Sequence, residues 1–92
     1  MIARRIVIHG SVQGVGFRFA FVDAARESGV VGWVRNRFDG SVEALVQGEP
    51  PATERVIAWS RRGPPGARVT DVEVNDVPVD ASLTDFAQRA SA

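Results

Sequence analysis

Residues 5–28 read RIVIHGSVQGVGFRFAFVDAARES, and the pattern of apolar residues changes within this stretch. Residues 5–9 have a β-branched centre, Ile6-Val7-Ile8, and are bounded by Gly10, which predicts a buried strand. From Phe17 onward the apolar residues follow helical spacing, and Gly29 stands where a left-handed helix C-cap is expected. The segment between them, residues 11–16, contains two glycines and predicts a loop. The stretch therefore predicts a strand, a loop and a helix in that order.

The rest of the chain continues with alternating strands and a second helix. Asp39 and Gly40 supply the positive backbone angle of a hairpin, whose loop is expected over residues 37–40. The other expected elements are strands over 30–36 and 42–47, a helix from Pro51 or its neighbours to Gly63, a strand over 68–75 and a short candidate strand over 83–87. The order βαββαβ predicts one α+β domain over residues 1–92. Its expected form is a ferredoxin-like antiparallel sheet with both helices on one face.

Composition excludes several classes of site. The 92 residues include 11 basic side chains, all arginine, and 11 acidic ones, so the formal net charge is zero. Nucleic-acid-binding domains are usually basic, and we expect no such partner. The absence of cysteine excludes disulfides, thiolate metal sites and cysteine nucleophiles. No apolar run approaches the roughly 18 residues that cross a bilayer. We expect a cytoplasmic monomer that acts on a small molecule and needs no cofactor or metal.

Residues 10–18, GSVQGVGFR, carry the strongest functional signal. Glycines let successive backbone N–H groups turn toward one point, and a helix N-terminus adds unpaired N–H groups and a positive dipole end. Arg18 follows in the first helical turn, where its guanidinium can bind a phosphate through two hydrogen bonds. A tight structural turn with Arg18 in solvent would suit the same residues. The functional interpretation is a phosphate-binding loop formed by Gln13, Gly14, Val15, Gly16, Phe17 and Arg18.

Two motifs resemble the signatures of the acylphosphatases, small enzymes that hydrolyse carboxyl–phosphate mixed anhydrides. They are G-x-V-Q-G-V-x-F-R over residues 10–18 and G-W-V-x-N-x-x-D-G-x-V-E over residues 32–43. The resemblance covers roughly residues 4–77. It implies that Arg18 binds the substrate phosphate, that Asn36 orients the attacking water, and that the products are a carboxylate and inorganic phosphate.

Two features depart from the family pattern. Ser11 stands where a basic residue is common, which would weaken substrate attraction without changing the chemistry. The family usually ends in an apolar alternating strand with an aromatic residue, whereas residues 83–90 keep Phe86 but are otherwise polar. This polarity puts the fifth strand in question.

Other polar and aromatic side chains have plainer interpretations. From its position before the hairpin alone, Asn36 would be expected to hydrogen-bond backbone amides of the turn. Because the motif that contains Asn36 occurs together with the first motif, the catalytic role is favoured. We expect His9, on a β-branched strand, to pack or to face a sheet edge. Trp33 and Trp59 are expected in the core or at its margin. Phe38 would rim a substrate cleft or cover the end of the sheet.

The implied reaction makes modest chemical demands. A carboxylic acid with a pKa of about 4–5 leaves without a general acid. Phosphoryl transfer then needs positioning and charge stabilisation, which an arginine and backbone donors supply without a metal. The alternative is a non-catalytic regulatory domain of the same fold that binds a small molecule or anion. Hydrolysis of an acyl phosphate without metal would distinguish the two.

Overall fold

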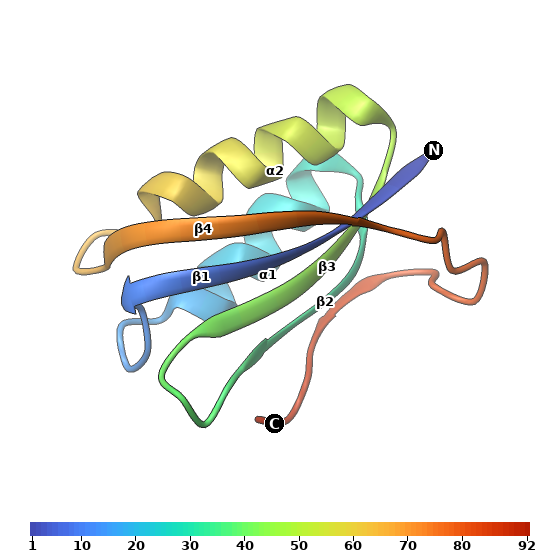
Figure 1. The fold of residues 1–92 in the computed structure, drawn as a ribbon. Coiled ribbons are helices and arrows are strands. Elements are labelled where there is room, and N and C mark those ends of the chain that lie inside the picture. The colour runs from blue at the N-terminus through green and yellow to red at the C-terminus, as the bar shows by residue number, and fades with distance from the viewer.

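A five-stranded sheet carries both helices on one face (Figure 1). The computed structural model describes all 92 residues. The elements are β1 (Ile2–Ser11), α1 (Phe17–Ser28), β2 (Val31–Asn36), β3 (Val42–Gly48), α2 (Pro50–Arg62), β4 (Arg68–Val77) and β5 (Phe86–Gln88). The strand order in the sheet is β4-β1-β3-β2-β5. This is the predicted α+β arrangement, and neither helix is long and apolar enough to span a membrane.

The sheet is mixed, whereas the sequence predicted an antiparallel one. Strands β1, β3, β4 and β2 pair antiparallel, but β5 pairs parallel to β2. β4 lies at one edge of the sheet and β5 at the other (Figure 1). The chain after β4 therefore crosses from one edge to the other, and β5 then runs beside β2 in the same direction. The buried Gln47 holds this crossing, since its side-chain amide exchanges two hydrogen bonds of 2.9 and 2.8 Å with the backbone of Asp80.

The fifth strand exists but is shorter than the candidate range 83–87. It covers only Phe86–Gln88, and Phe86 is fully buried with its ring stacked 5.5 Å from that of Phe21. A single aromatic anchor therefore docks an otherwise polar segment, because burying one phenyl ring contributes about 2 kcal/mol.

The core lies between the helices and the sheet. Helix α1 buries Phe17, Phe21 and Ala25, and it ends at Gly29 in the expected left-handed conformation, with φ of 77°. Trp59 of α2 packs edge-on against Phe17 and Phe21 with ring centroids 5.5 Å apart. These aromatic contacts fix the position of α1 and therefore of the loop that precedes it.

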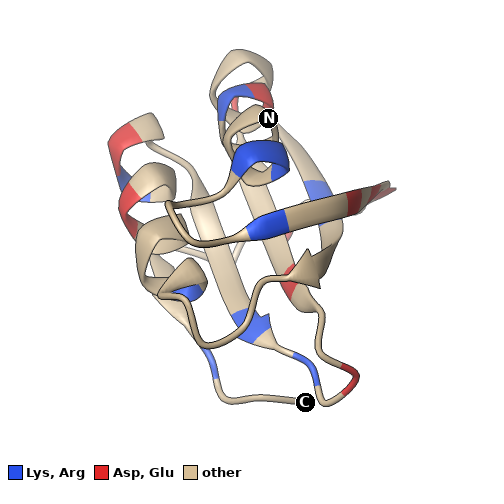
Figure 2. Ribbon diagram, turned by 90° about the vertical axis from the view of Figure 1, so that its left-hand side faces the viewer, with Lys and Arg blue, Asp and Glu red and all other residues tan.

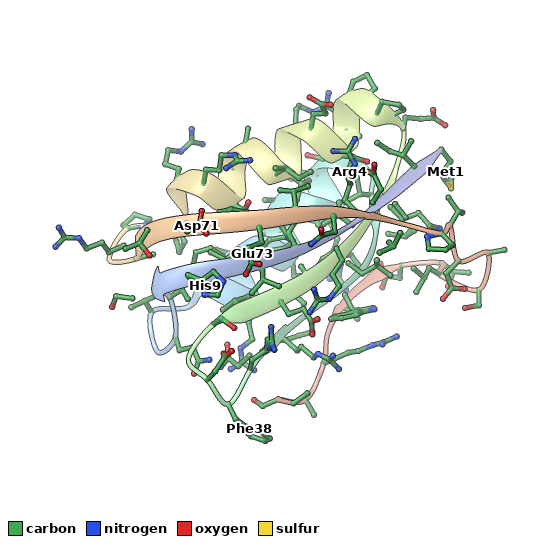
Figure 3. All side chains as sticks on the ribbon, viewed as in Figure 1. Met1, Arg4, His9, Phe38, Asp71 and Glu73 are labelled. Carbon is green, nitrogen blue, oxygen red and sulfur yellow. The ribbon has the colours of Figure 1, made fainter.

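The other face of the sheet carries charged side chains. The guanidinium groups of Arg35 and Arg89 both contact the Trp33 ring there, at 4.6 and 5.0 Å from its centroid. His9 bonds Glu73 at 2.6 Å on the same sheet (Figure 3). Figure 2 shows acidic and basic residues interspersed over helices and strands.

The buried Glu43 anchors the charge network of this face. Its carboxylate accepts hydrogen bonds from Arg5 Nε at 2.5 Å and from Arg35 Nε at 2.7 Å, and it pairs with both guanidinium groups. Burial raises the pKa of Glu43, but the bonds from Arg35 and Arg5 outweigh burial and hold the pKa below its ordinary value of 4.5.

Replacing Glu43 by glutamine should therefore lower the free energy of unfolding by about 2 kcal/mol at pH 7. A depressed pKa gives stability that is present above the ordinary carboxyl pKa and is lost as pH falls through the folded value. The difference between wild type and E43Q should thus shrink in acid, measured by urea unfolding from pH 7 to pH 3. A difference in the free energy of unfolding that stays constant across this pH range would contradict the lowered pKa of Glu43.

Candidate active site

The loop between β1 and α1 has the conformation that an anion site requires. Gly14 and Gly16 have φ of 74° and 75°, a region that side chains with a Cβ rarely adopt. A Cβ at either position would meet nothing within 4 Å, so backbone conformation and not crowding demands glycine. Gly16 is the N-cap of α1, and no side chain caps the helix there.

Backbone N–H groups of this loop have no acceptor within the protein. The first bond of the helix runs from the Ala20 N–H to the Gly16 carbonyl at 3.0 Å, so the amides of Phe17, Arg18 and Phe19 precede the helical ladder. The amides of Gly14 and Gly16 donate to no protein group either. Consecutive free donors at the positive end of a helix favour binding of an anion.

Gln13 ties the loop to the β2–β3 hairpin at the same end of the molecule (Figure 1). Its Nε2 donates to the carbonyls of Arg37 at 2.7 Å and Ser41 at 2.9 Å. The predicted phosphate-binding loop included Gln13 and Val15. The side-chain N–H group of Gln13 is engaged with the hairpin and the side chain of Val15 packs against the core, so the donors that these two residues offer an anion are their backbone N–H groups.

A pocket of about 120 Å³ opens between the loop and the end of β2. It brings together four predicted loop residues, namely Gly14, Gly16, Phe17 and Arg18, and the predicted water-orienting residue Asn36. Val12, Phe19 and Gln88 complete the lining. The two sequence motifs therefore meet at one small cavity.

The alternation of side chains along β2 explains why Asn36 reaches the pocket. Val34 faces the helices and is fully buried, so Asn36, two residues later, points to the same side. The alternative role in the hairpin is taken by Asp39, which accepts bonds from the amide and hydroxyl of Ser41 at 2.9 and 2.6 Å. The hydroxyl bond, followed by the amide bond, lowers the pKa of Asp39. No hydrogen bond within the protein engages the Asn36 side chain.

Arg18 is half-buried at the pocket and unpaired. None of the seven ion pairs of the molecule includes it, and no carbonyl accepts a hydrogen bond from its guanidinium. An unpaired guanidinium beside free amides can take a dianion without first breaking a salt bridge.

The chain is similar to one known protein family over most of its length. The acylphosphatase family model matches residues 4–88. The chain belongs to the acylphosphatase family. The match runs past the predicted limit near residue 77 and includes β5.

Relatives within the family match from about three quarters to nearly all of the chain. An acylphosphatase of Acidovorax sp. (strain JS42) is 54% identical over 88 residues, which are 96% of this chain and 90% of that protein. One from Thermococcus kodakarensis is 57% identical over 67 residues, 73% of this chain and 74% of its own. The crystal structure of acylphosphatase from Bacillus subtilis superposes with a TM-score of 0.93 at 35% identity, covering 97% of this chain and 99% of that one.

Gln88 is a pocket residue that the sequence did not reveal. It pairs with Val34 across the parallel β2–β5 contact, so it faces the helix side as Val34 does. Beyond β5 the chain still follows β2: the Arg89 N–H donates to the Val34 carbonyl at 2.8 Å and the Ala92 N–H to the Asn36 carbonyl at 3.1 Å. The C-terminal segment thus holds the strand end that carries Asn36. Gln88 could not be assigned to the pocket from the sequence because the parallel pairing of β5 with β2 was not predicted.

Two residues that the sequence analysis considered, His9 and Phe38, lie outside the pocket. His9 faces Glu73 and does not line the pocket. Phe38 is 86% exposed at the hairpin tip and points away from the molecule (Figure 3), so it neither rims this pocket nor covers the sheet. No group of three or more His, Asp or Glu side chains is arranged to hold a metal ion.

A larger groove of about 520 Å³ lies elsewhere, between α2 and β4. It is lined by two arginines, two acids and apolar side chains, and Arg4 there pairs with Asp76 at 2.6 Å. Its cations are matched by acids, and neither motif contributes to it. The chemistry therefore favours the smaller pocket as the active site of this family member.

Replacing Gln13 by alanine should loosen the loop from the hairpin. Loss of two hydrogen bonds should lower the free energy of unfolding by about 1–2 kcal/mol. The kcat/KM for acetyl phosphate should fall about tenfold, because Arg18 and Asn36 lose their fixed separation. Gln13→Glu keeps the shape of the side chain but removes its N–H donor. This variant should therefore show the same losses as Gln13→Ala in urea unfolding and in turnover assays. Wild-type stability and activity in both variants would contradict the anchoring role.

Proposed function

We propose that Arg18 and the free amides at the start of α1 bind the phosphate of an acyl phosphate while Asn36 holds the attacking water. The reaction of the family is hydrolysis of the carboxyl–phosphate bond. The observation that carries the assignment of residues is the single pocket shared by Arg18, Asn36 and the glycines of the loop.

The chemical steps balance with these groups alone. The water oxygen forms a bond to phosphorus, the bond from phosphorus to the acyl oxygen breaks, and its electron pair leaves on the carboxylate. Because that carboxylic acid has a pKa of about 4–5, no proton donor is needed for the leaving group. A phosphate oxygen takes the proton of the water, since an asparagine amide cannot act as a strong base.

Each proposed group has a role suited to its chemistry. The Arg18 guanidinium and backbone N–H groups stabilise the equatorial oxygens of the transferring phosphoryl group. The Asn36 side-chain amide can accept a hydrogen bond from water and donate another, which orients the water oxygen toward phosphorus. These contributions are electrostatic and positional, as phosphoryl transfer requires.

Hydrolysis of acetyl phosphate in ¹⁸O-labelled water containing EDTA tests the proposal. We expect turnover with the label in inorganic phosphate, because water attacks phosphorus. Label in acetate would place the attack at the carbonyl carbon. Saturable phosphate binding without turnover would support the regulatory anion-binding alternative, which no other observation favours.

The sequence-based expectations of a monomer, of cytoplasmic location and of no nucleic-acid partner stay predictions. The interspersed charges of Figure 2 agree with the last of them, since nucleic-acid surfaces usually gather basic residues on one face. Light scattering of the purified protein would test the monomeric state.

A further inference from the structure

Most of the pocket lining is accounted for by the proposed phosphate and water sites. Gly14, Gly16 and Arg18 surround the phosphate, and Asn36 holds the water. Val12 and Phe17 are buried core residues that form the floor. The side chains of the remaining two, Phe19 and Gln88, have no role in this scheme, and the acyl group of the substrate has no contact in it.

Phe19 is the exposed apolar side chain of the pocket. It is 72% exposed, although burying a phenyl ring is favourable, and the core does not use it because Phe17 and Phe21 form the inward stripe of α1. Phe19 follows Arg18 directly in the first helical turn. The Phe19 ring therefore lines the same pocket as the proposed phosphate-binding residue Arg18.

The geometry of displacement also points to the helix side. In an in-line reaction the leaving oxygen lies opposite the attacking water. Asn36 reaches the pocket from the sheet, whereas Phe19 reaches it from α1. With water at the sheet wall, the acyl group is directed toward the helix wall, where Phe19 is available.

We propose that Phe19 contacts the acyl group and makes this protein prefer acyl phosphates with an apolar or aromatic acyl group. This inference rests on the proposed function of the same pocket. A ring of this size that becomes partly buried against substrate should improve kcat/KM for benzoyl phosphate over acetyl phosphate by about five- to tenfold.

The test compares kcat/KM for benzoyl phosphate and acetyl phosphate in wild type, Phe19→Ala and Phe19→Leu. Phe38→Ala is the matched control, because Phe38 is also a largely exposed phenylalanine but does not line the pocket. We expect F19A to lose about five- to tenfold with benzoyl phosphate and less than twofold with acetyl phosphate. F19L should recover part of the loss, and F38A should match wild type.

Competitive inhibition by inorganic phosphate separates this inference from the proposed function. The inhibition constant should be the same in wild type and F19A, because the substitution keeps the backbone N–H of residue 19 and removes only a side chain that does not touch the phosphate. Equal losses with both substrates in F19A, or an unchanged preference, would overturn the role of Phe19 while leaving the proposed function intact. Failure of wild type to hydrolyse either substrate would overturn both.

Discussion

Substitution of Arg18 by lysine is expected to reduce kcat/KM for acetyl phosphate by about 100-fold or more, although the positive charge is kept. A planar guanidinium donates two parallel hydrogen bonds to a phosphate, whereas an ammonium is a point charge at the end of a flexible chain. Arg18→Ala should lose about 1,000-fold, within the range found for removal of a transition-state arginine. Steady-state kinetics with acetyl phosphate measure both losses.

The matched control is Arg55→Lys, on the exposed surface of α2 and outside the pocket. It should retain wild-type kcat/KM, which shows that lysine substitution alone is harmless. Circular dichroism of each variant establishes that the fold is kept. A folded R18K protein with wild-type turnover would show that the phosphate is not bound through the guanidinium of Arg18.

Replacement of Asn36 by alanine should lower kcat by about 100-fold and leave inhibition by inorganic phosphate within about twofold of wild type. The reason is that water orientation acts in the transition state, while the phosphate is held by Arg18 and the loop amides. Kinetics at saturating substrate, with phosphate as competitive inhibitor, separate these two effects.

Asn36→Asp provides a second variant with nearly the same shape. A carboxylate in this pocket should repel the phosphate dianion, so we expect weaker phosphate inhibition together with low kcat. Strong loss of phosphate inhibition in N36A as well would mean that Asn36 binds the substrate and does not position water. The different behaviour of the two variants therefore identifies the role.

The elements governed by local sequence were predicted well. Glycine at a helix end and a strand of β-branched residues act through backbone conformation and side-chain pattern within a few residues. Helix α1 accordingly begins at Phe17 and ends before Gly29 as expected. The pairing of Arg18 with Asn36 came from the resemblance of the two motifs to the family signatures, and both residues line one pocket.

Features that depend on distant contacts could not be read from the sequence. The parallel course of β5 depends on Phe86 stacking against Phe21 and on Gln47 holding the crossing segment, and neither partner is near in sequence. Gln88 in the pocket follows from that pairing. The hairpin contacts of the Gln13 side chain are another case, since the motif shows that this residue matters but not that its amide binds two carbonyls 24 and 28 residues away.

The most direct test of the central claim is a titration with inorganic phosphate, followed by the amide ¹H–¹⁵N shifts of the ¹⁵N-labelled protein. We predict saturable shifts that are largest for the backbone N–H groups of residues 14–19, and we predict that they disappear in Arg18→Ala. Shifts centred on another part of the surface, or unchanged shifts in Arg18→Ala, would contradict the claim that this loop and this guanidinium bind the phosphate together.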